Sequence, residues 1–123
     1  MKECPFCKIE KSNLLLESEH SFAILDKYPV NNGHILVIPK RHEKDYFKLS
    51  IKEKEDLWNL VDKTNIYMTK IFKPDGVNIG INIEEVAGQT IMHCHLHLIP
   101  RYEGDTEDPR GGVRGVIPSK QKY

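Results

Sequence analysis

The stretch Ile91-Met92-His93-Cys94-His95-Leu96-His97-Leu98-Ile99 places three histidines at alternate positions among mostly apolar residues. Successive side chains of a β-strand point to opposite faces, so this alternation predicts a strand with all three histidines on one face. The opposite face is expected to pack in the core, and it consists of Met92, Cys94, Leu96 and Leu98. Cys94 is therefore interpreted as a small buried apolar residue and not as a nucleophile.

Three other segments have the pattern of strands. Residues 77–83 (VNIGINI) alternate, with valine and isoleucines on a face expected to be buried and small or polar residues on the other. Residues 34–38 (HILVI) form an almost continuous apolar run, which is typical of a strand covered on both faces. Residues 21–26 (SFAILD) predict a further strand, and the proline, asparagines and glycine that follow predict a loop.

One main helix is expected after Ser50, which forms a capping-box pattern with Glu53. The sequence Lys73-Pro74-Asp75-Gly76 ends it. The order of strands and helix predicts an α+β fold, an antiparallel sheet of about five strands with the helix on one face. The apolar residues at helical spacing are Leu57, Leu60, Val61, Thr64, Met68, Ile71 and Phe72.

The composition limits the classes of protein to which this chain can belong. Its 123 residues suffice for one domain, and we expect a domain over residues 1–102 and a partly extended or mobile tail over 103–123. Basic and acidic residues number 18 each, so the basic excess of a protein that wraps nucleic acid is missing. Neither a membrane span of ~20 apolar residues nor a signal peptide is recognisable, so we expect a cytoplasmic protein without a membrane or sequence-specific nucleic-acid partner.

Cys4 and Cys7 are separated by two residues, and Cys94 makes the number of cysteines odd. In a reducing compartment this spacing fits a metal site better than a disulfide framework. The alternative is a redox pair, which needs a following helix that lowers the thiol pKa. Residues 8–16 have only a short helical tendency, so the metal site is favoured.

The three histidines allow two chemistries. In the first, two or three imidazoles hold a zinc ion with an open position for water, as in a metallohydrolase. In the second, a neutral imidazole attacks phosphorus while its neighbours hold the phosphate oxygens and protonate the leaving group. Crowded imidazoles disfavour one another's protonation, which suits both chemistries. The spacing alone does not choose between them.

Four motifs together resemble the histidine triad (HIT) family of nucleotide hydrolases and transferases. Residues 93–101 (HCHLHLIPR) resemble the family's triad strand, and residues 87–90 (AGQT) resemble the approach to it. Residues 22–26 (FAILD) and 33–40 (GHILVIPK) resemble its nucleoside-binding half. The resemblance extends over about residues 4–102 and implies an α+β sheet that pairs as a homodimer.

The resemblance also implies roles for individual residues. His95 corresponds to the nucleophile that attacks the α-phosphorus, His97 to the phosphate contact and proton donor, and His34 to the histidine that orients the triad. Asp26 corresponds to the ligand of the ribose hydroxyls, which its carboxylate would accept in a bidentate way. The residues in the positions of the phosphate contacts are Asn82, Gly88, Gln89 and Thr90.

The segment Cys4-Pro5-Phe6-Cys7 resembles the zinc-binding start of bacterial-type family members. The resemblance assigns the remaining two ligands to His42 and His93. Two thiolates and two imidazoles form a closed tetrahedral set, so the expected zinc is structural and does not activate water.

The function expected from these motifs is hydrolysis of a nucleoside phosphoramidate or dinucleoside polyphosphate, with a purine nucleotide as substrate and a nucleotidyl-histidine intermediate. The alternatives are a zinc-activated hydrolase that uses the histidines as ligands and a nucleotide-binding or adaptor module with little turnover. The basic segment at residues 110–114 (RGGVR) is expected either to reach a polyphosphate or to be a solvated tail.

Overall fold

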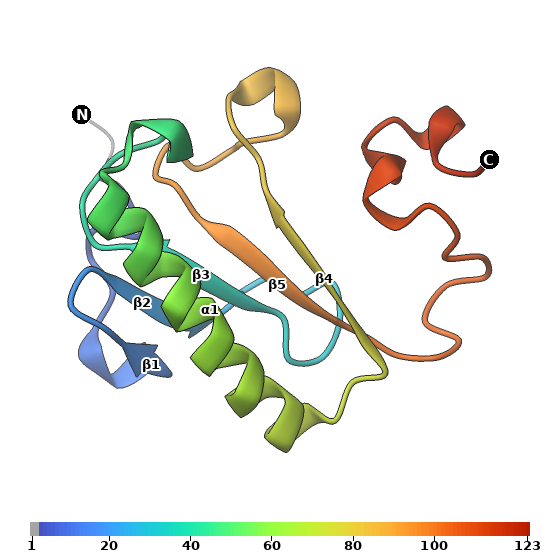
Figure 1. Cartoon of the computed structure of the whole chain (residues 1–123), viewed down its shortest axis with the longest axis horizontal. Helices are drawn as coiled ribbons and strands as arrows, with labels where there is room; N and C mark the ends of the chain where they lie inside the picture. The colour runs from blue at the N-terminus through green and yellow to red at the C-terminus, as the bar shows by residue number, and fades with distance from the viewer. Residues whose placement is uncertain (1–2) are drawn as a thin grey trace.

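The computed structural model describes residues 3–123 as one five-stranded sheet with a long helix packed across it (Figure 1). All strand pairs are antiparallel, and the spatial order is β1-β2-β3-β5-β4. The α+β class, the antiparallel sheet and the single main helix expected from the sequence are confirmed. The elements are β1 (Leu16–Glu17), β2 (Ser21–Leu25), β3 (Ile35–Pro39), α1 (Ile51–Phe72), β4 (Gly76–Ile81) and β5 (Leu96–Arg101).

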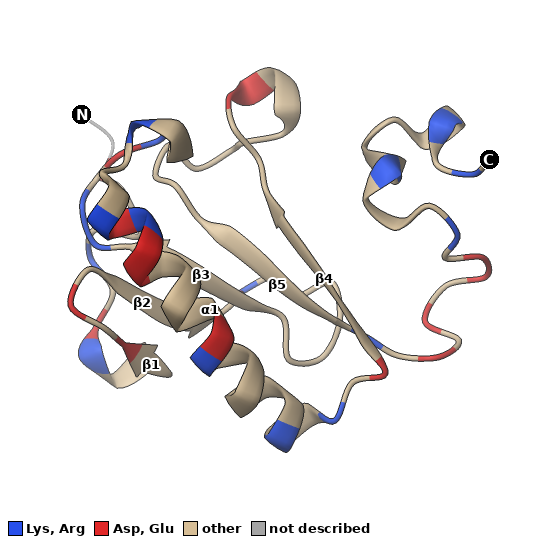
Figure 2. Ribbon diagram, viewed as in Figure 1, with Lys and Arg blue, Asp and Glu red and all other residues tan. Residues whose placement is uncertain are grey.

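Short 3-10 turns occupy several of the connections, and two of them lie in the C-terminal tail. Charged residues gather on α1 and in the loops, whereas the middle strands carry almost none (Figure 2). Among residues 3–123, none of the helices combines the length and the apolar composition that a membrane span requires. The turns are η1 (Lys11–Asn13), η2 (Tyr46–Lys48), η3 (Glu85–Ala87), η4 (Gly112–Val116) and η5 (Pro118–Lys120).

The sheet has a hydrophobic core on each side, which explains why β2 and β3 are apolar at nearly every position. On one face, α1 packs against strand residues that include Ala23, Val37 and Leu96. On the other face, Phe6 of the N-terminal segment packs against residues of β2 and β3. The second core consists of Phe6, Phe22, Ile24, Leu36 and Ile38.

Helix α1 begins at the predicted capping box. The Ser50 hydroxyl accepts a hydrogen bond from the Glu53 backbone N–H, and the Glu53 carboxylate accepts one from the Ser50 N–H. The Arg41 guanidinium donates to the same carboxylate at 3.0 Å and lowers the pKa of Glu53 to about 2. Lys73 ends the helix in the left-handed conformation, at φ 50°.

The strand predicted over residues 91–99 begins later than expected, at Leu96. His93 and His95 precede it, because the backbone here bonds to another loop: the Cys94 N–H donates to the Glu43 carbonyl at 2.6 Å. Cys94 is fully buried, as expected, but the prediction for Met92 is wrong, since its side chain is 38% exposed.

The prediction that the apolar face of β4 is buried is also wrong in part. Val77 is 37% exposed and Ile79 is 43% exposed. Strand β4 lies at the edge of the sheet, where α1 makes its contacts with β1, β2, β3 and β5 instead. Ile81, opposite Leu96, does pack against the core. Ile71 of α1 was likewise expected in the apolar stripe and is 54% exposed.

Candidate active site and metal cluster

The histidines gather on the face of the sheet opposite α1, where β5 begins. His97 lies on β5 between Leu36 of β3 and Gly80 of β4. His95 lies beside it, with ring centroids 5.1 Å apart. His34, just before β3, completes the group from the other side, at 5.2 Å from the His97 ring. The fold therefore brings together three histidines that the sequence places in two separate segments.

The His95 ring is held by a backbone carbonyl. Its Nδ1 lies 2.8 Å from the carbonyl oxygen of His93, which can only accept, so Nδ1 carries the proton. Nε2 of the neutral ring then has a free lone pair. The Phe6 ring packs edge-on against His95 at a centroid distance of 5.1 Å, and the His95 side chain is 8% exposed. One imidazole nitrogen is thus prepared for attack or for metal binding.

A chain of hydrogen bonds sets the tautomers of the other two histidines. The Val30 backbone N–H donates to Nδ1 of His34 at 3.0 Å, which leaves the proton of neutral His34 on Nε2. This Nε2 lies 3.0 Å from Nδ1 of His97 and donates to it. Neutral His97 therefore carries its own proton on Nε2, the nitrogen directed away from His34.

Burial keeps both of these histidines neutral near pH 7. Desolvation lowers the pKa of His97 to about 4, and the neighbouring His95 and His34 rings act in the same direction. Desolvation also lowers the pKa of His34, although the Asp26 carboxylate opposes it. The Asp26 carboxylate lies 3.4 Å from Nε2 of His34 and also accepts the Tyr28 N–H. Asp26 is thus placed at the edge of the histidine group, with its side chain 15% exposed.

The loop between β4 and β5 contains the four residues expected to contact phosphate. Asn82 and Gly88 face each other, since a Cβ on Gly88 would lie 3.8 Å from the Asn82 amide. Gly88 has φ +99°, a backbone conformation that favours glycine. Thr90 is exposed. The loop thus presents Asn82, Gly88 and Thr90 at its surface.

Gln89 differs from the other three residues because it is buried, at 2% exposure. Its Oε1 accepts the Glu84 N–H at 2.9 Å. Its Nε2 donates to the carbonyls of Lys44 and Ile91 at 3.0 and 3.1 Å. With both amide hydrogens and the oxygen engaged, this side chain shapes the loop from inside.

The four predicted metal ligands converge, and their ligand atoms all lie within 4.8 Å of one another. Cys4 Sγ and Cys7 Sγ lie 3.3 and 3.6 Å from Nδ1 of His93, and His42 Nδ1 lies 3.2 Å from it. Bonds of ~2.3 Å to sulfur and ~2.0–2.1 Å to nitrogen place the ligand atoms of a tetrahedron roughly 3.3–3.8 Å apart. The donor set and its spacing therefore fit zinc.

His93 is oriented for this role by its other ring nitrogen. Nε2 donates to the carbonyl of Pro39 at 2.7 Å, which leaves Nδ1 with the lone pair that faces the two cysteines. Burial and the adjacent Cys4 thiol raise the pKa of Cys7, which is opposite to the lowered pKa of a redox-active thiol. The geometry thus favours the metal interpretation over the redox pair.

Sequence reasoning did not identify Phe6 as part of the site. Its ring packs against His95 and also against His93, at a centroid distance of 5.9 Å. The position of Phe6 between Cys4 and Cys7 was a usable signal. If both cysteines bind a metal ion, the residue between them must lie close to the same site. The sequence pattern gave no indication of the backbone groups that select the histidine tautomers. These are the N–H of Val30 and the carbonyls of Pro39 and His93.

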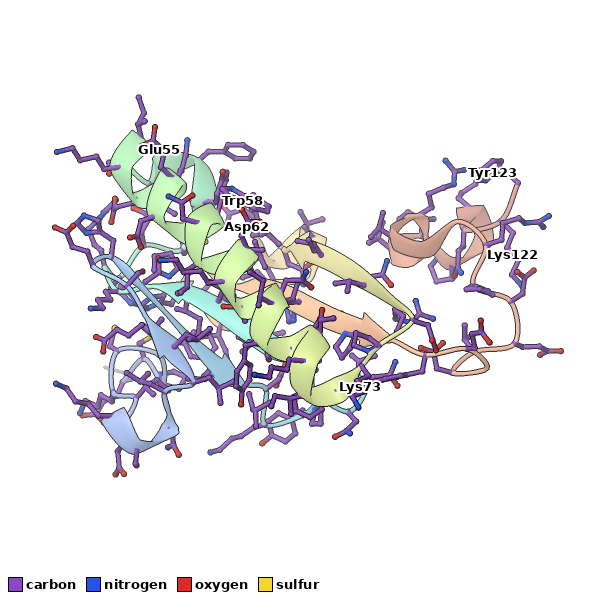
Figure 3. All side chains as sticks on the ribbon, turned by 60° about the horizontal axis from the view of Figure 1, so that its bottom comes forward. Glu55, Trp58, Asp62, Lys73, Lys122 and Tyr123 are labelled. Carbon is purple, nitrogen blue, oxygen red and sulfur yellow. The ribbon has the colours of Figure 1, made fainter. Side chains whose placement is uncertain are left out.

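The basic segment of the tail is engaged within the tail itself. The Arg114 guanidinium donates to the carbonyls of Lys120 and Gln121 and stacks over the Tyr123 ring at 4.7 Å. Lys122 and Tyr123 lie at the far side of the molecule from Glu55, Trp58 and Asp62 of α1 (Figure 3). Arg114 is therefore directed toward its own segment in this structure.

Comparison with known proteins assigns the family. Residues 8–104 match the HIT domain, which covers most of the chain and both groups of histidines. The chain belongs to the HIT domain family. An uncharacterized HIT-like protein of Methanocaldococcus jannaschii is 41% identical over 120 residues, covering 92% of this chain and 91% of that protein.

Several relatives have named activities, and two of them are the following. A bis(5'-adenosyl)-triphosphatase of Dictyostelium discoideum is 36% identical over 100 residues and covers 81% of this chain and 67% of its own. An adenosine 5'-monophosphoramidase of Schizosaccharomyces pombe is 38% identical over 102 residues, with 80% and 74% covered.

Solved structures of the HIT family share the fold. A HIT family protein of Bacillus anthracis is 42% identical with a TM-score of 0.77, covering 83% of this chain and 75% of that one. A zinc-bound histidine triad family protein of Mycobacterium smegmatis is 33% identical with a TM-score of 0.70, covering 77% and 69%.

Proposed function

We propose that this protein hydrolyses a nucleotide at its α-phosphorus and releases a nucleoside monophosphate, with His95 as the nucleophile. The observation that carries the proposal is the hydrogen bond from His95 Nδ1 to the His93 carbonyl, which leaves the lone pair on Nε2. His97 lies beside it with Nε2–H as a donor. A nucleophile and a donor on one face of the sheet are what substitution at phosphorus requires.

In the first step, Nε2 of His95 attacks the phosphorus, and the bond to the leaving group breaks. A polyphosphate departs as an anion, whereas an amine needs one proton. The amine takes this proton from solvent, because the hydrogen bonds of Val30 and His34 leave the His34–His97 pair no nitrogen for an additional proton. The Nε2–H of His97 donates a hydrogen bond to the departing nitrogen.

In the second step, water attacks the nucleotidyl-histidine, the bond between phosphorus and His95 breaks, and the electron pair returns to Nε2. The proton of the water is released to solvent. The Nδ1–H of His95 stays on the His93 carbonyl throughout and stabilises the positive charge of the intermediate.

The substrates proposed are an adenosine phosphoramidate or a dinucleoside polyphosphate, because the two named relatives act on compounds of these kinds. We assign the ribose hydroxyls to Asp26, and the phosphate to Asn82, Gly88 and Thr90. Gln89 supports this loop through its three backbone hydrogen bonds instead of donating to phosphate itself.

We propose that Cys4, Cys7, His42 and His93 hold a structural zinc. Four protein ligands fill a tetrahedral site, so zinc supplies a cross-link between the N-terminus and the sheet. His93 would then serve twice, with its ring on the metal and its carbonyl on His95. The support for zinc is the donor set of this chain and the zinc-bound family structure.

A metal-activated hydrolase is disfavoured by the tautomers of the histidines. Asp26, His34 and His97 lie close enough to hold a metal ion. However, the Val30 N–H occupies the lone pair of His34 Nδ1, so the proton is on Nε2, the nitrogen that would have to bind the metal. The same nitrogen is 3.0 Å from His97, a hydrogen-bond distance.

The substitution His95→Ala tests the proposal. It should reduce turnover of an adenosine phosphoramidate by at least about a thousandfold while AMP still binds, since the nucleophile is lost and the ribose and phosphate contacts remain. His20→Ala, in a partly exposed histidine outside the site, is the matched control. Turnover that survives in His95→Ala refutes the assignment of His95 as the nucleophile. A different outcome is that the wild-type protein binds AMP but cleaves none of these substrates faster than free imidazole does. That outcome supports a nucleotide-binding module instead of an enzyme.

We also propose that the protein forms a homodimer through the uncovered edge of the sheet. Within residues 3–123 no strand pairs with the outer edge of β4, and its residues Val77 and Ile79 are exposed. An unpaired edge strand with apolar side chains favours association with another chain.

A further inference from the structure

The loop between β2 and β3, residues 26–34, holds the group that selects the tautomer of His34. Val30 donates its backbone N–H to Nδ1 of His34, and the His34 N–H donates to the carbonyl of Asn31 at 3.1 Å. The loop is thus folded back onto the histidine that ends it. A shift of the loop would move the Val30 N–H away from the ring.

The Asn31 side chain anchors this loop to the end of β5. Its Nδ2 donates to the Pro100 carbonyl at 3.0 Å and to Asp105 Oδ2 at 2.8 Å. The Tyr102 hydroxyl adds a third bond, to the Asn32 carbonyl at 2.6 Å. All three hydrogen bonds join the loop to residues 100–105, which are about 70 positions away along the chain.

Asp105 is held in turn from β5. Arg101 donates through Nε and Nη2 at 2.8 and 2.7 Å, and the Tyr102 N–H donates at 2.9 Å. These donors, Arg101 first among them, hold the pKa of Asp105 far below its usual value, so the carboxylate stays charged. Arg101 also donates to Asn78 of β4 at 2.7 Å. The anchor is therefore connected to two strands of the sheet.

The Phe72 ring packs against Gly33 at the end of the loop, whereas hydrogen bonds of Asn31 hold the part of the loop next to Val30. Val30 and Asn31 line a cavity of about 490 Å³ together with Ile99, Arg101 and residues of the tail. The Val30 side chain is 66% exposed, so it makes little contact that could replace the bonds of Asn31.

We propose that Asn31, anchored by Asp105, is a positioning residue for the histidine chain: it holds the Val30 N–H on His34 so that His34 donates to His97. The catalytic part of this inference rests on the proposed function. Loss of the Asn31 amide would leave His34 free to exchange tautomers, and His97 would no longer present Nε2–H in every molecule.

The experiment compares Asn31→Ala with wild type by the ¹⁵N signals of the ring nitrogens in the substrate-free protein. We expect one tautomer of His34 in wild type and a mixture in Asn31→Ala. Turnover of an adenosine phosphoramidate should fall ~10- to 100-fold in kcat, with a smaller change in KM. Asn32→Ala is the matched control. Within residues 3–123, Asn32 makes a hydrogen bond through its backbone carbonyl and none through its side chain.

Unchanged ring signals in Asn31→Ala overturn the proposal, and so does a tautomer mixture with unchanged kcat. Asp105→Asn is a second variant in case Asn31→Ala does not fold; it removes the charge that Arg101 pairs with and should produce the same mixture. A purely structural anchor would lower the melting temperature without altering the ring signals. If the wild-type protein cleaves no nucleotide, the proposed function fails, while the ring signals still decide whether Asn31 positions His34.

Discussion

Single hydrogen bonds to a carbonyl or to another ring decide which nitrogen of each histidine in this site carries the proton. The ring of His93 donates to Pro39 and faces the cysteines, whereas the ring of His95 donates to the carbonyl of His93 and keeps its other nitrogen free. His97 receives a hydrogen bond from His34 and retains a donor. Three residues of one type, within five positions, thus differ in which ring nitrogen carries the proton and what it faces, because each meets a different carbonyl or ring nitrogen.

Buried His97 makes a testable contribution to stability at acid pH. Its pKa is about 4 in the folded protein, below the ~6.5 of an unfolded histidine, so between these values the unfolded chain binds more protons. The contribution of neutral His97 is therefore complete above about pH 6.5 and is lost as the pH falls toward 4. We expect roughly 1–3 kcal/mol from this source.

The measurement is the free energy of unfolding by urea from pH 7.5 to pH 4 for wild type and His97→Gln. The difference between the two proteins should change over this range, because glutamine does not titrate. Parallel curves would show that His97 is not shifted. Because metal binding itself depends on pH, only the difference between the two proteins tests His97, and both are measured in the same zinc concentration.

At the scale of elements, residues 4–7 meet the sheet through Phe6 and through the cluster formed by Cys4, Cys7, His42 and His93. Residues 4–7 have no strand partner, and their ligand atoms meet His42 after β3 and His93 before β5. Phe6 lies between the two cysteines and packs in the second core. A zinc ion here would join three separate segments of the chain.

Removal of zinc is expected to destabilise the protein before it affects the chemistry. Chelation should lower the melting temperature by at least about 10 °C, because the cross-link and the packing of Phe6 are lost together. Cys4→Ser should abolish binding of one zinc per chain, measured by elemental analysis, whereas Cys94→Ala should retain it. Burial raises the pKa of Cys94 to about 12, and this thiol is outside the cluster.

The alternative outcome is a loss of turnover at temperatures where the zinc-free protein remains folded. That result would identify the metal as catalytic. Retained turnover below the lowered melting temperature is the result that a structural zinc predicts.

At the scale of the whole molecule, the sheet has one edge that is suited to pair with a second copy. Strand β4 exposes Val77 and Ile79 on the face that α1 covers elsewhere, and the tail that follows β5 also exposes Val113 and Val116, at 60% and 76%. In Figure 1 the tail extends beyond β4 and away from α1, so the edge and the tail lie on the same side of the molecule.

Ile79→Lys is expected to weaken the proposed dimer by at least about tenfold, because a charge would be placed in an apolar interface. Sedimentation equilibrium measures the dissociation constant. Val86→Lys is the matched control, since Val86 is 98% exposed in the loop between β4 and β5. A wild-type protein that sediments as a monomer, or equal dissociation constants for wild type and Ile79→Lys, would contradict the interface.

Local patterns in the sequence were sufficient for the fold class and for the residue types of the site. The capping box at Ser50 places the start of α1 through contacts only three residues apart, and the alternation at Leu96 and Leu98 identifies the buried face of β5. The HIT family assignment was likewise anticipated from motifs, and so was the set of Cys4, Cys7, His42 and His93, whose ligand atoms the fold brings together.

Tertiary structure alone decided the remaining features, since they depend on atoms that are distant in the sequence. Nothing near His93 and His95 indicates that the backbone between them bonds with residue 43, or that the carbonyl of residue 93 orients the His95 ring. The exposure of Val77 and Ile79 depends on which strand lies at the sheet edge, which a period of two residues does not encode. The sequence determined which side chains are available, and the packing of strands determined which nitrogen of each histidine is free.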